Sequence, residues 1–259
     1  VLGGLLAFWL TGCTTVNETG RKQIMLVSQE QETQLGLTSF DQMKQEVPIS
    51  KDAAANALVK KVGERIAAVV GADLPNAKWE FVVFDSKEAN AFCLPGGKIG
   101  IYTGILPISQ NEAGLATVMG HEVAHAIARH GAERMSEGMG MDVLGKWLSG
   151  ALTSADPTVQ QGAKLAFGLG SQYGVALPHS RMQESEADRI GLRYMARAGY
   201  DPEEAVKFWE RFSAFTKQAG GGSGSWYEKF LRTHPLDETR IKQLKDWMPE
   251  AKAQFRQTK

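Results

Sequence analysis

Hydrophobic residues recur every three to four positions along several stretches of the chain, a pattern that predicts amphipathic helices. The clearest of these helices is expected over residues 52–70, and Gly71 marks its end. The other predicted helices cover residues 28–46, 111–130, 135–148, 159–172, 183–198, 201–217 and the stretch that starts near 236.

Two segments rich in β-branched and aromatic residues interrupt the helical pattern. WEFVVFD, at residues 79–85, is predicted to be a strand. Residues 90–106 are predicted to form two short strands around a Pro-Gly-Gly turn. The strands are few and they precede the helix at 111–130. The predicted fold class is therefore α+β and helix-dominated, with a small β-sheet beside that helix.

The first twelve residues are uncharged and apolar, but they are fewer than the roughly 18 that a membrane-spanning helix needs. We expect residues 1–12 to be the remnant of a signal peptide. The end of this stretch, Leu10–Cys13, resembles a bacterial lipobox, in which the cysteine carries lipid. Cys13 is therefore the predicted lipidation site, and residues 13–25 a polar, lipid-anchored tether. The alternatives are a buried helix with a chance cysteine, and a disulfide between Cys13 and Cys93.

Lipidation would place the protein in the bacterial cell envelope, anchored to a membrane surface through Cys13 and facing the periplasm. Thr14 follows the cysteine where an aspartate often retains lipoproteins at the inner membrane, so the outer membrane is weakly favoured. Basic and acidic residues balance at 29 each, and no basic stripe is visible, so no nucleic-acid partner is expected. Residues 26–259 are expected to form a single domain, with a flexible Gly-rich loop at 218–225.

The predicted helix at 111–130 carries the strongest chemical signal. His121 and His125 are four residues apart, so their imidazoles share one helix face and can bind one ion. Glu122 lies about 100° round the helix from His121, beside the open position of that ion. This H-E-x-x-H arrangement supplies two zinc ligands and a general base. His130 would point about 180° away from His121 on an unbroken helix, and is interpreted as a structural or surface histidine.

A third ligand must come from elsewhere in the chain. In QESEADRIG, at residues 183–191, Glu184 and Asp188 are four positions apart and share a helix face. This pair resembles the zincin arrangement in which a glutamate from a later helix is the third ligand and an aspartate follows four residues on, so Glu184 is the expected third zinc ligand. Asp188 can accept a hydrogen bond from a ligand imidazole and fix its tautomer. The alternative is a solvated acidic start of a helix.

The chain resembles the HtpX-like and CAAX-prenyl-protease-type metallopeptidases, a gluzincin family, in a soluble periplasmic lipoprotein branch. The resemblance spans about residues 24–245 and implies a zincin-type core, one Zn²⁺ per chain and Glu184 as a ligand. Prenyl processing is not implied, because the membrane helices of that branch are absent. The matching motifs are NAFCLPGG at 90–97, HEVAH at 121–125, ESEAD at 184–188 and THPLDETR at 233–240.

The same resemblance places His234 near the zinc, either as a displaceable fourth ligand or as a donor to the oxyanion, with Arg240 as a helper. The alternative is an ordinary loop histidine. His179, which follows Pro178, is interpreted as a loop residue, and Cys93 stands where alanine is common in the family.

Together these features predict a zinc-dependent endopeptidase that cleaves unfolded or misassembled envelope proteins, with Glu122 as the base for a zinc-activated water. The polypeptide substrate is expected to add as a strand along an edge formed by β-strand 98–102. The alternatives are a non-catalytic, membrane-tethered chaperone with a structural zinc, and a latent protease whose site is capped by His234. The predicted substrate-binding residues are Asn90, Gly97, Lys98, Ile99, Gly100 and Ile101.

Overall fold

A computed structural model describes residues 12–153, 156–171, 177–218, 234–235 and 238–257. Its internal contacts divide the chain into two compact units. The larger unit comprises residues 30–128 and 184–259, and the smaller one residues 1–29 and 129–183. The predicted boundaries of a single domain at 26–259 stay a prediction.

The larger unit contains a three-stranded sheet formed by β3 (Glu80–Phe84), β4 (Ala91–Leu94) and β5 (Lys98–Tyr102). The strand order is β3-β5-β4, in which β5 runs parallel to β3 and antiparallel to β4. The sheet is therefore small and mixed, and its members are the strands that the sequence predicts. Every residue of β5 is buried, as expected for a central strand.

The position of β5 corrects the predicted substrate edge. Both sides of this strand are already hydrogen-bonded, to β3 and to β4, so it has no open edge for a peptide. Gly100 has a packing role instead, because a Cβ atom there would collide with the ring of Phe92. The outer strand of the sheet on this side is β4, which lies against the helix that carries His121.

Polar caps set the beginnings of the main helices in the larger unit. The Asp52 carboxylate accepts hydrogen bonds from the amides of Ala54 and Ala55, and the Asn111 side chain accepts one from Gly114. Asp201 does the same for the amide of Glu203. The helices are α2 (Gln29–Glu46), α3 (Ala53–Val70), α4 (Leu106–Ser109), α5 (Glu112–Ile127), α8 (Leu177–Arg197), α9 (Glu203–Gln218) and α11 (Glu238–Gln257), with 3₁₀ turns at Gly71–Asp73 and Thr103–Ile105.

Helices α5 and α8 approach each other closely through two glycines. A Cβ atom on Gly120 would lie 2.9 Å from the carbonyl oxygen of Gly191, and one on Gly191 would lie 2.8 Å from the amide nitrogen of His121. Real Cβ atoms need more room than this, so only glycine fits at both positions. The contact brings the α8 carboxylates within reach of the α5 histidines.

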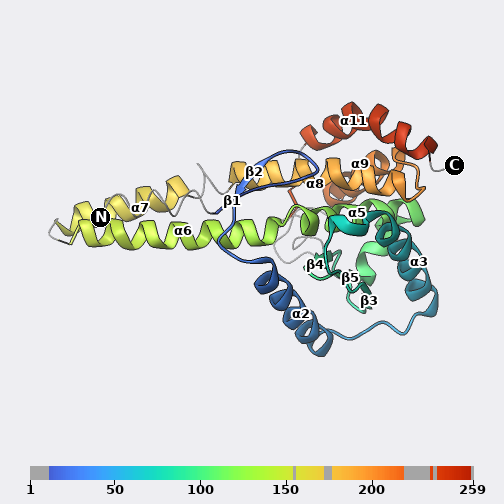
Figure 1. Ribbon diagram of the computed structural model, residues 1–259, viewed down its shortest axis with the longest axis horizontal. Coiled ribbons are helices and arrows are strands. Elements are labelled where there is room, and N and C mark those ends of the chain that lie inside the picture. The colour runs from blue at the N-terminus through green and yellow to red at the C-terminus, as the bar shows by residue number, and fades with distance from the viewer. Residues whose placement is uncertain (1–11, 154–155, 172–176, 219–233, 236–237, 258–259) are drawn as a thin grey trace. The chain divides into compact units, whose positions relative to one another are not determined.

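The smaller unit differs more from expectation. Residues predicted to be a polar tether contain a two-stranded antiparallel hairpin, formed by β1 (Cys13–Thr15) and β2 (Lys22–Ile24). Arg21 of this hairpin donates to the carboxylate of Glu133 at 2.5 and 2.8 Å. Glu133 lies on α6 (His130–Ala151), which packs beside α7 (Pro157–Ser171) (Figure 1).

The predicted helix at 111–130 ends earlier than its pattern indicates. Arg129 adopts a left-handed conformation with φ of 56°, so α5 stops at Ile127 and a new helix starts at His130. His179 also lies within α8 and not in a loop. The predicted loop at 218–225 and the apolar stretch at 1–11 lie outside the described residues, apart from position 218.

The helix-dominated α+β fold class is confirmed. Within the described part of the chain, no helix combines the length and the apolar character that crossing a membrane requires.

Candidate metal centre

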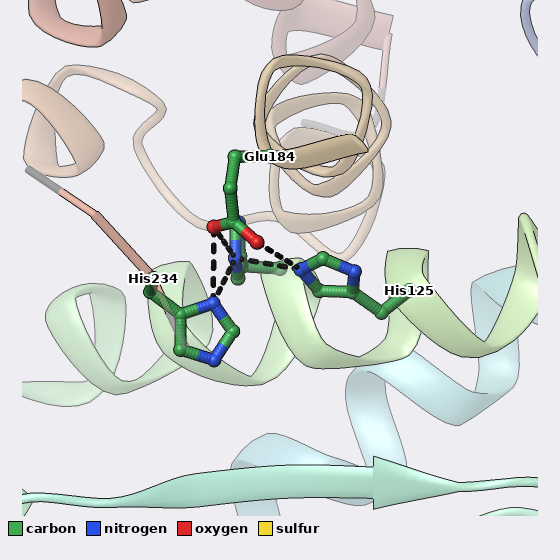
Figure 2. Close-up of side chains that lie close together, drawn as sticks. His125, Glu184 and His234 are labelled. Atoms are coloured by element: carbon green, nitrogen blue, oxygen red, sulfur yellow. Dashed lines mark hydrogen bonds and ion pairs between the residues drawn. The ribbon is translucent and has the colours of Figure 1, made fainter. Parts of the chain in front are cut away.

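Four buried residues of the larger unit offer a compact set of metal-ligand atoms: His121, His125, Glu184 and His234. Their ligand atoms all lie within 4.8 Å of one another. Figure 2 shows His125, Glu184 and His234 pointing toward one another. The two α5 histidines lie one helical turn apart, while Glu184 comes from α8 and His234 from the segment before α11.

The spacing of these atoms fits a tetrahedral zinc-type ion. Four ligand atoms about 2.0–2.1 Å from a common centre lie about 3.3 Å apart at the corners of a tetrahedron. The His121 Nε2 atom lies 3.1 Å from His125 Nε2, 3.2 Å from His234 Nδ1 and 3.2 Å from Glu184 Oε2. The other Glu184 oxygen lies 3.3 Å from His125 Nε2. Imidazole nitrogens and a carboxylate are also the ligand types that zinc takes.

The buried charges fit a divalent cation as well. Glu122, Glu184 and Asp188 are each no more than 4% exposed. Arg240, also buried, supplies one positive charge beside Glu184 and Asp188. A divalent ion held by neutral imidazoles and Glu184 would supply two further positive charges, so that three positive charges would balance the three carboxylates. Buried charges are costly unless they are balanced in this way.

Asp188 lies where a partner for a ligand imidazole is expected. Its Oδ1 atom is 3.0 Å from Nδ1 of His121, so an Nδ1–H would leave Nε2 to face the group of ligand atoms. Without an ion, burial opposes protonation of His121, but hydrogen bonds to Asp188 and Glu184 outweigh it and raise its pKa to about 9. An ion at Nε2 would compete with that proton.

The two carboxylates of α8 are held in their ionised form. Burial alone would raise the pKa of Glu184, but His125, His121 and His234 lower it far below its usual range. Burial is likewise outweighed at Asp188, where Arg240 and His121 lower the pKa. Both groups are therefore carboxylates at neutral pH, as a ligand and its hydrogen-bond partner must be.

Glu122 and His234 face each other beside the group. The Nε2 atom of His234 lies 3.4 Å from Glu122 Oε1, while its Nδ1 atom lies 3.0 Å from Glu184 Oε2. The single ring of His234 thus spans from the predicted base to the predicted ligand. A carboxylate in this position can accept a proton from a water held at the group.

Arg240 is more central than the sequence indicates, and Trp209 was missed entirely. One edge of the Arg240 guanidinium, formed by Nε and Nη2, donates to both oxygens of Asp188 at 2.7 and 2.8 Å. The guanidinium carbon lies 4.0 Å from the centre of the Trp209 ring. Arg240 was visible in the THPLDETR motif. Trp209 lies in a strongly amphipathic helix, where its spacing indicates only a core residue.

The remaining predicted residues lie elsewhere or stay untested. His130 is buried in the smaller unit and is not one of the four residues of the group. Cys93 is partly exposed on β4, and the structure shows both Cys93 and Cys13 as free cysteines. Burial and the charge of Glu122 raise the pKa of the Cys93 thiol. Lipidation of Cys13 stays a prediction without support in the structure.

The comparisons with known proteins place this site in a family. The pattern of peptidase family M48 matches residues 53–248, most of the chain. The chain belongs to peptidase family M48. It is therefore an enzyme of the metallopeptidase class, and the predicted kind of family is confirmed at this level. The matched stretch includes all four residues of the metal group.

Several curated proteins are similar to this M48 peptidase. It is 38% identical over 193 residues to the mitochondrial metalloendopeptidase OMA1 of Schizosaccharomyces pombe, covering 74% of this chain and 53% of that protein. It is 34% identical to the OMA1 of Saccharomyces cerevisiae, over 100% of this chain and 75% of that protein. The beta-barrel assembly-enhancing protease of Escherichia coli is 28% identical over 93% of this chain and 48% of its own length. The chain thus spans about half to three quarters of these relatives.

These relatives overturn the predicted location. The proteins matched in two yeasts, in Arabidopsis thaliana and in Bos taurus are all named mitochondrial. The predicted location in the bacterial cell envelope, facing the periplasm, is therefore wrong. The predicted HtpX-like lipoprotein branch is likewise not the group to which the matched relatives belong.

Proposed function

We propose that this M48 peptidase is a zinc-dependent endopeptidase that cleaves unfolded or misassembled proteins. The observation that carries the proposal is the arrangement of His121, His125 and Glu184 with Glu122 directly beside them. Two histidines from one helix and a glutamate from another form one of the ligand sets found in catalytic zinc sites. The relatives named metalloendopeptidases support cleavage within chains.

The residues of this chain divide the chemistry among them. His121, His125 and Glu184 would hold one zinc ion, which when bound lowers the pKa of a water ligand and polarises the scissile carbonyl. Glu122 accepts the proton of the attacking water and then delivers it to the leaving amine. Asp188 keeps His121 in the tautomer that presents Nε2.

The polypeptide substrate would add as a strand along β4. This strand is the outer member of the sheet beside α5, and none of the described strands pairs with its far side. Main-chain hydrogen bonds along such an edge bind many sequences with little preference. That property suits an enzyme whose substrates share an unfolded state and no motif.

The test is cleavage of casein by the zinc-loaded chain and by Glu122→Gln, with the zinc content of both measured. We expect the wild type to cleave, and the variant to bind zinc equally well but lose at least about 100-fold in activity, because it lacks the base. Retained activity in Glu122→Gln would exclude Glu122 as the base. A wild type that binds zinc without cleaving would contradict the peptidase proposal.

A second candidate, a latent protease capped by His234, is favoured by the position of that ring. Its Nδ1 atom lies among the ligand atoms, and its Nε2 atom faces Glu122. The ring would therefore fill the fourth ligand position and block the access of water to Glu122. His234→Ala should then raise basal casein cleavage severalfold. An oxyanion donor predicts the opposite, a loss of about 100-fold with zinc retained.

A further inference from the structure

Arg240 joins three segments of the larger unit at one buried guanidinium. It lies on α11 and donates to both oxygens of Asp188 on α8, at 2.7 and 2.8 Å. A third donor nitrogen binds the carbonyl oxygen of Pro235, at 3.1 Å, and lies 3.3 Å from Glu184 Oε2. The planar fork of arginine can bind in several fixed directions at once, which a lysine cannot do.

Trp209 packs against the Arg240 guanidinium. The indole comes from α9, is buried, and lies 4.0 Å from the Arg240 guanidinium carbon, measured to the ring centre. Trp209 also lies against His121, whose ring centre is 5.9 Å away at an interplanar angle of 74°. One aromatic side chain thus contacts both the arginine and a residue of the metal group.

We propose that Trp209 and Arg240 act together as positioning residues that retain the metal. The proposal rests on the zinc site of the proposed function. Arg240 acts on His121 through Asp188, and on His234 through the carbonyl of the adjacent Pro235. Trp209 fixes the plane of the guanidinium and keeps water from it, so that both sets of hydrogen bonds keep their direction.

This arrangement makes metal retention depend on a helix that supplies no ligand. Loosening Trp209 would let Arg240 rotate, which releases Asp188 and Pro235 together. His121 would then lose its fixed tautomer, and the His234 segment its anchor. Partners of metal ligands typically change metal affinity by 10- to 100-fold when they are removed. A residue that merely packs the core would lower stability without this effect.

The experiment measures the rate at which zinc leaves the loaded full chain when a chelating dye is added. The variants are Trp209→Leu, Trp209→Phe and Arg240→Lys. Phe40→Leu is the matched control, because Phe40 is equally buried in the same unit but packs against Phe84 and Phe92. Thermal unfolding of every metal-free variant measures the loss of packing separately.

We expect Trp209→Leu and Arg240→Lys to release zinc about 10- to 100-fold faster than the wild type, and Trp209→Phe to fall between. Phe40→Leu should unfold at a lower temperature yet release zinc within about twofold of the wild-type rate. Unchanged release from both Trp209→Leu and Arg240→Lys would overturn the proposal. So would faster release from Phe40→Leu to the same degree.

The outcome is separable from that of the proposed function. A wild type that holds zinc without cleaving casein would refute the peptidase proposal and leave zinc retention measurable. A wild type that cannot be loaded with zinc would refute the metal site, and the positioning role with it.

Discussion

Two clusters of buried polar residues in this protein each join carboxylate and arginine side chains, but they differ in their balance of charge. In the smaller unit, Glu133 receives two hydrogen bonds from Arg21 and one from the amide of Gln183. In the larger unit, three carboxylates surround four ligand atoms and Arg240 supplies one positive charge. The first cluster pairs one negative charge with one positive charge. The second has more negative than positive charge, which a divalent ion would balance.

The difference separates a structural cluster from a chemical one. A carboxylate that meets an arginine and an amide is satisfied by the protein itself and stabilises the position of a hairpin against a helix. A group of carboxylates and imidazoles with excess negative charge favours binding of a cation. Counting buried charges therefore distinguishes the two sites without reference to any relative.

Among substitutions in the two clusters, Glu184→Ala is expected to have the largest effect on zinc binding and activity. It removes both a proposed ligand and one of the three carboxylates, so the remaining residues can no longer balance a divalent ion. Zinc should be lost on dialysis, and casein cleavage should fall by roughly a thousandfold or more. Zinc analysis by mass spectrometry measures the first result directly. Full retention of zinc would show that Glu184 is not a ligand.

A smaller effect is expected from Glu133→Gln in the other cluster. The variant leaves the Arg21 cation beside a neutral amide, which should lower the free energy of unfolding by about 3 kcal/mol. Urea denaturation monitored by circular dichroism measures this change. The zinc content of the folded protein should equal that of the wild type. Loss of zinc in proportion to the loss of stability would mean that the two clusters are not independent.

The smallest effect is expected from Arg21→Lys, which keeps the charge but removes the two-pronged contact with Glu133. We expect a loss of about 1 kcal/mol in unfolding free energy and no change in the rate of zinc release. The matching substitution in the other cluster, Arg240→Lys, should accelerate zinc release. Equal rates of zinc release from Arg21→Lys and Arg240→Lys would show that the two clusters do not differ in their effect on the metal.

Much of the fold and of the candidate site could be predicted from local patterns. The helices at 53–70 and 203–218 begin and end within one or two residues of the capping and stop signals. The spacing in HEVAH and ESEAD places two residues on one helix face each, which is why His121, His125, Glu184 and Asp188 meet as expected. Such inferences need only the period of a helix.

The errors arose where distant parts of the chain decide the outcome. Strand order is set by pairing between segments, so the sequence did not show that β5 lies between β3 and β4. The helix break depends on Arg129, a residue type that rarely adopts a left-handed conformation. Trp209 contacts Arg240 and His121 only through the packing of three helices, and its own helix reads as an ordinary amphipathic one.

The separation of the site residues along the chain has a consequence for protein synthesis. His121 and His234 are 113 positions apart, and Arg240 follows still later. Translation runs from the N-terminus, so the HEVAH segment is made well before Glu184, His234 and Arg240. The unfinished polypeptide therefore lacks Glu184, His234 and Arg240 at that stage. The metal group, and with it the proposed peptidase activity, can therefore assemble only after translation has passed His234.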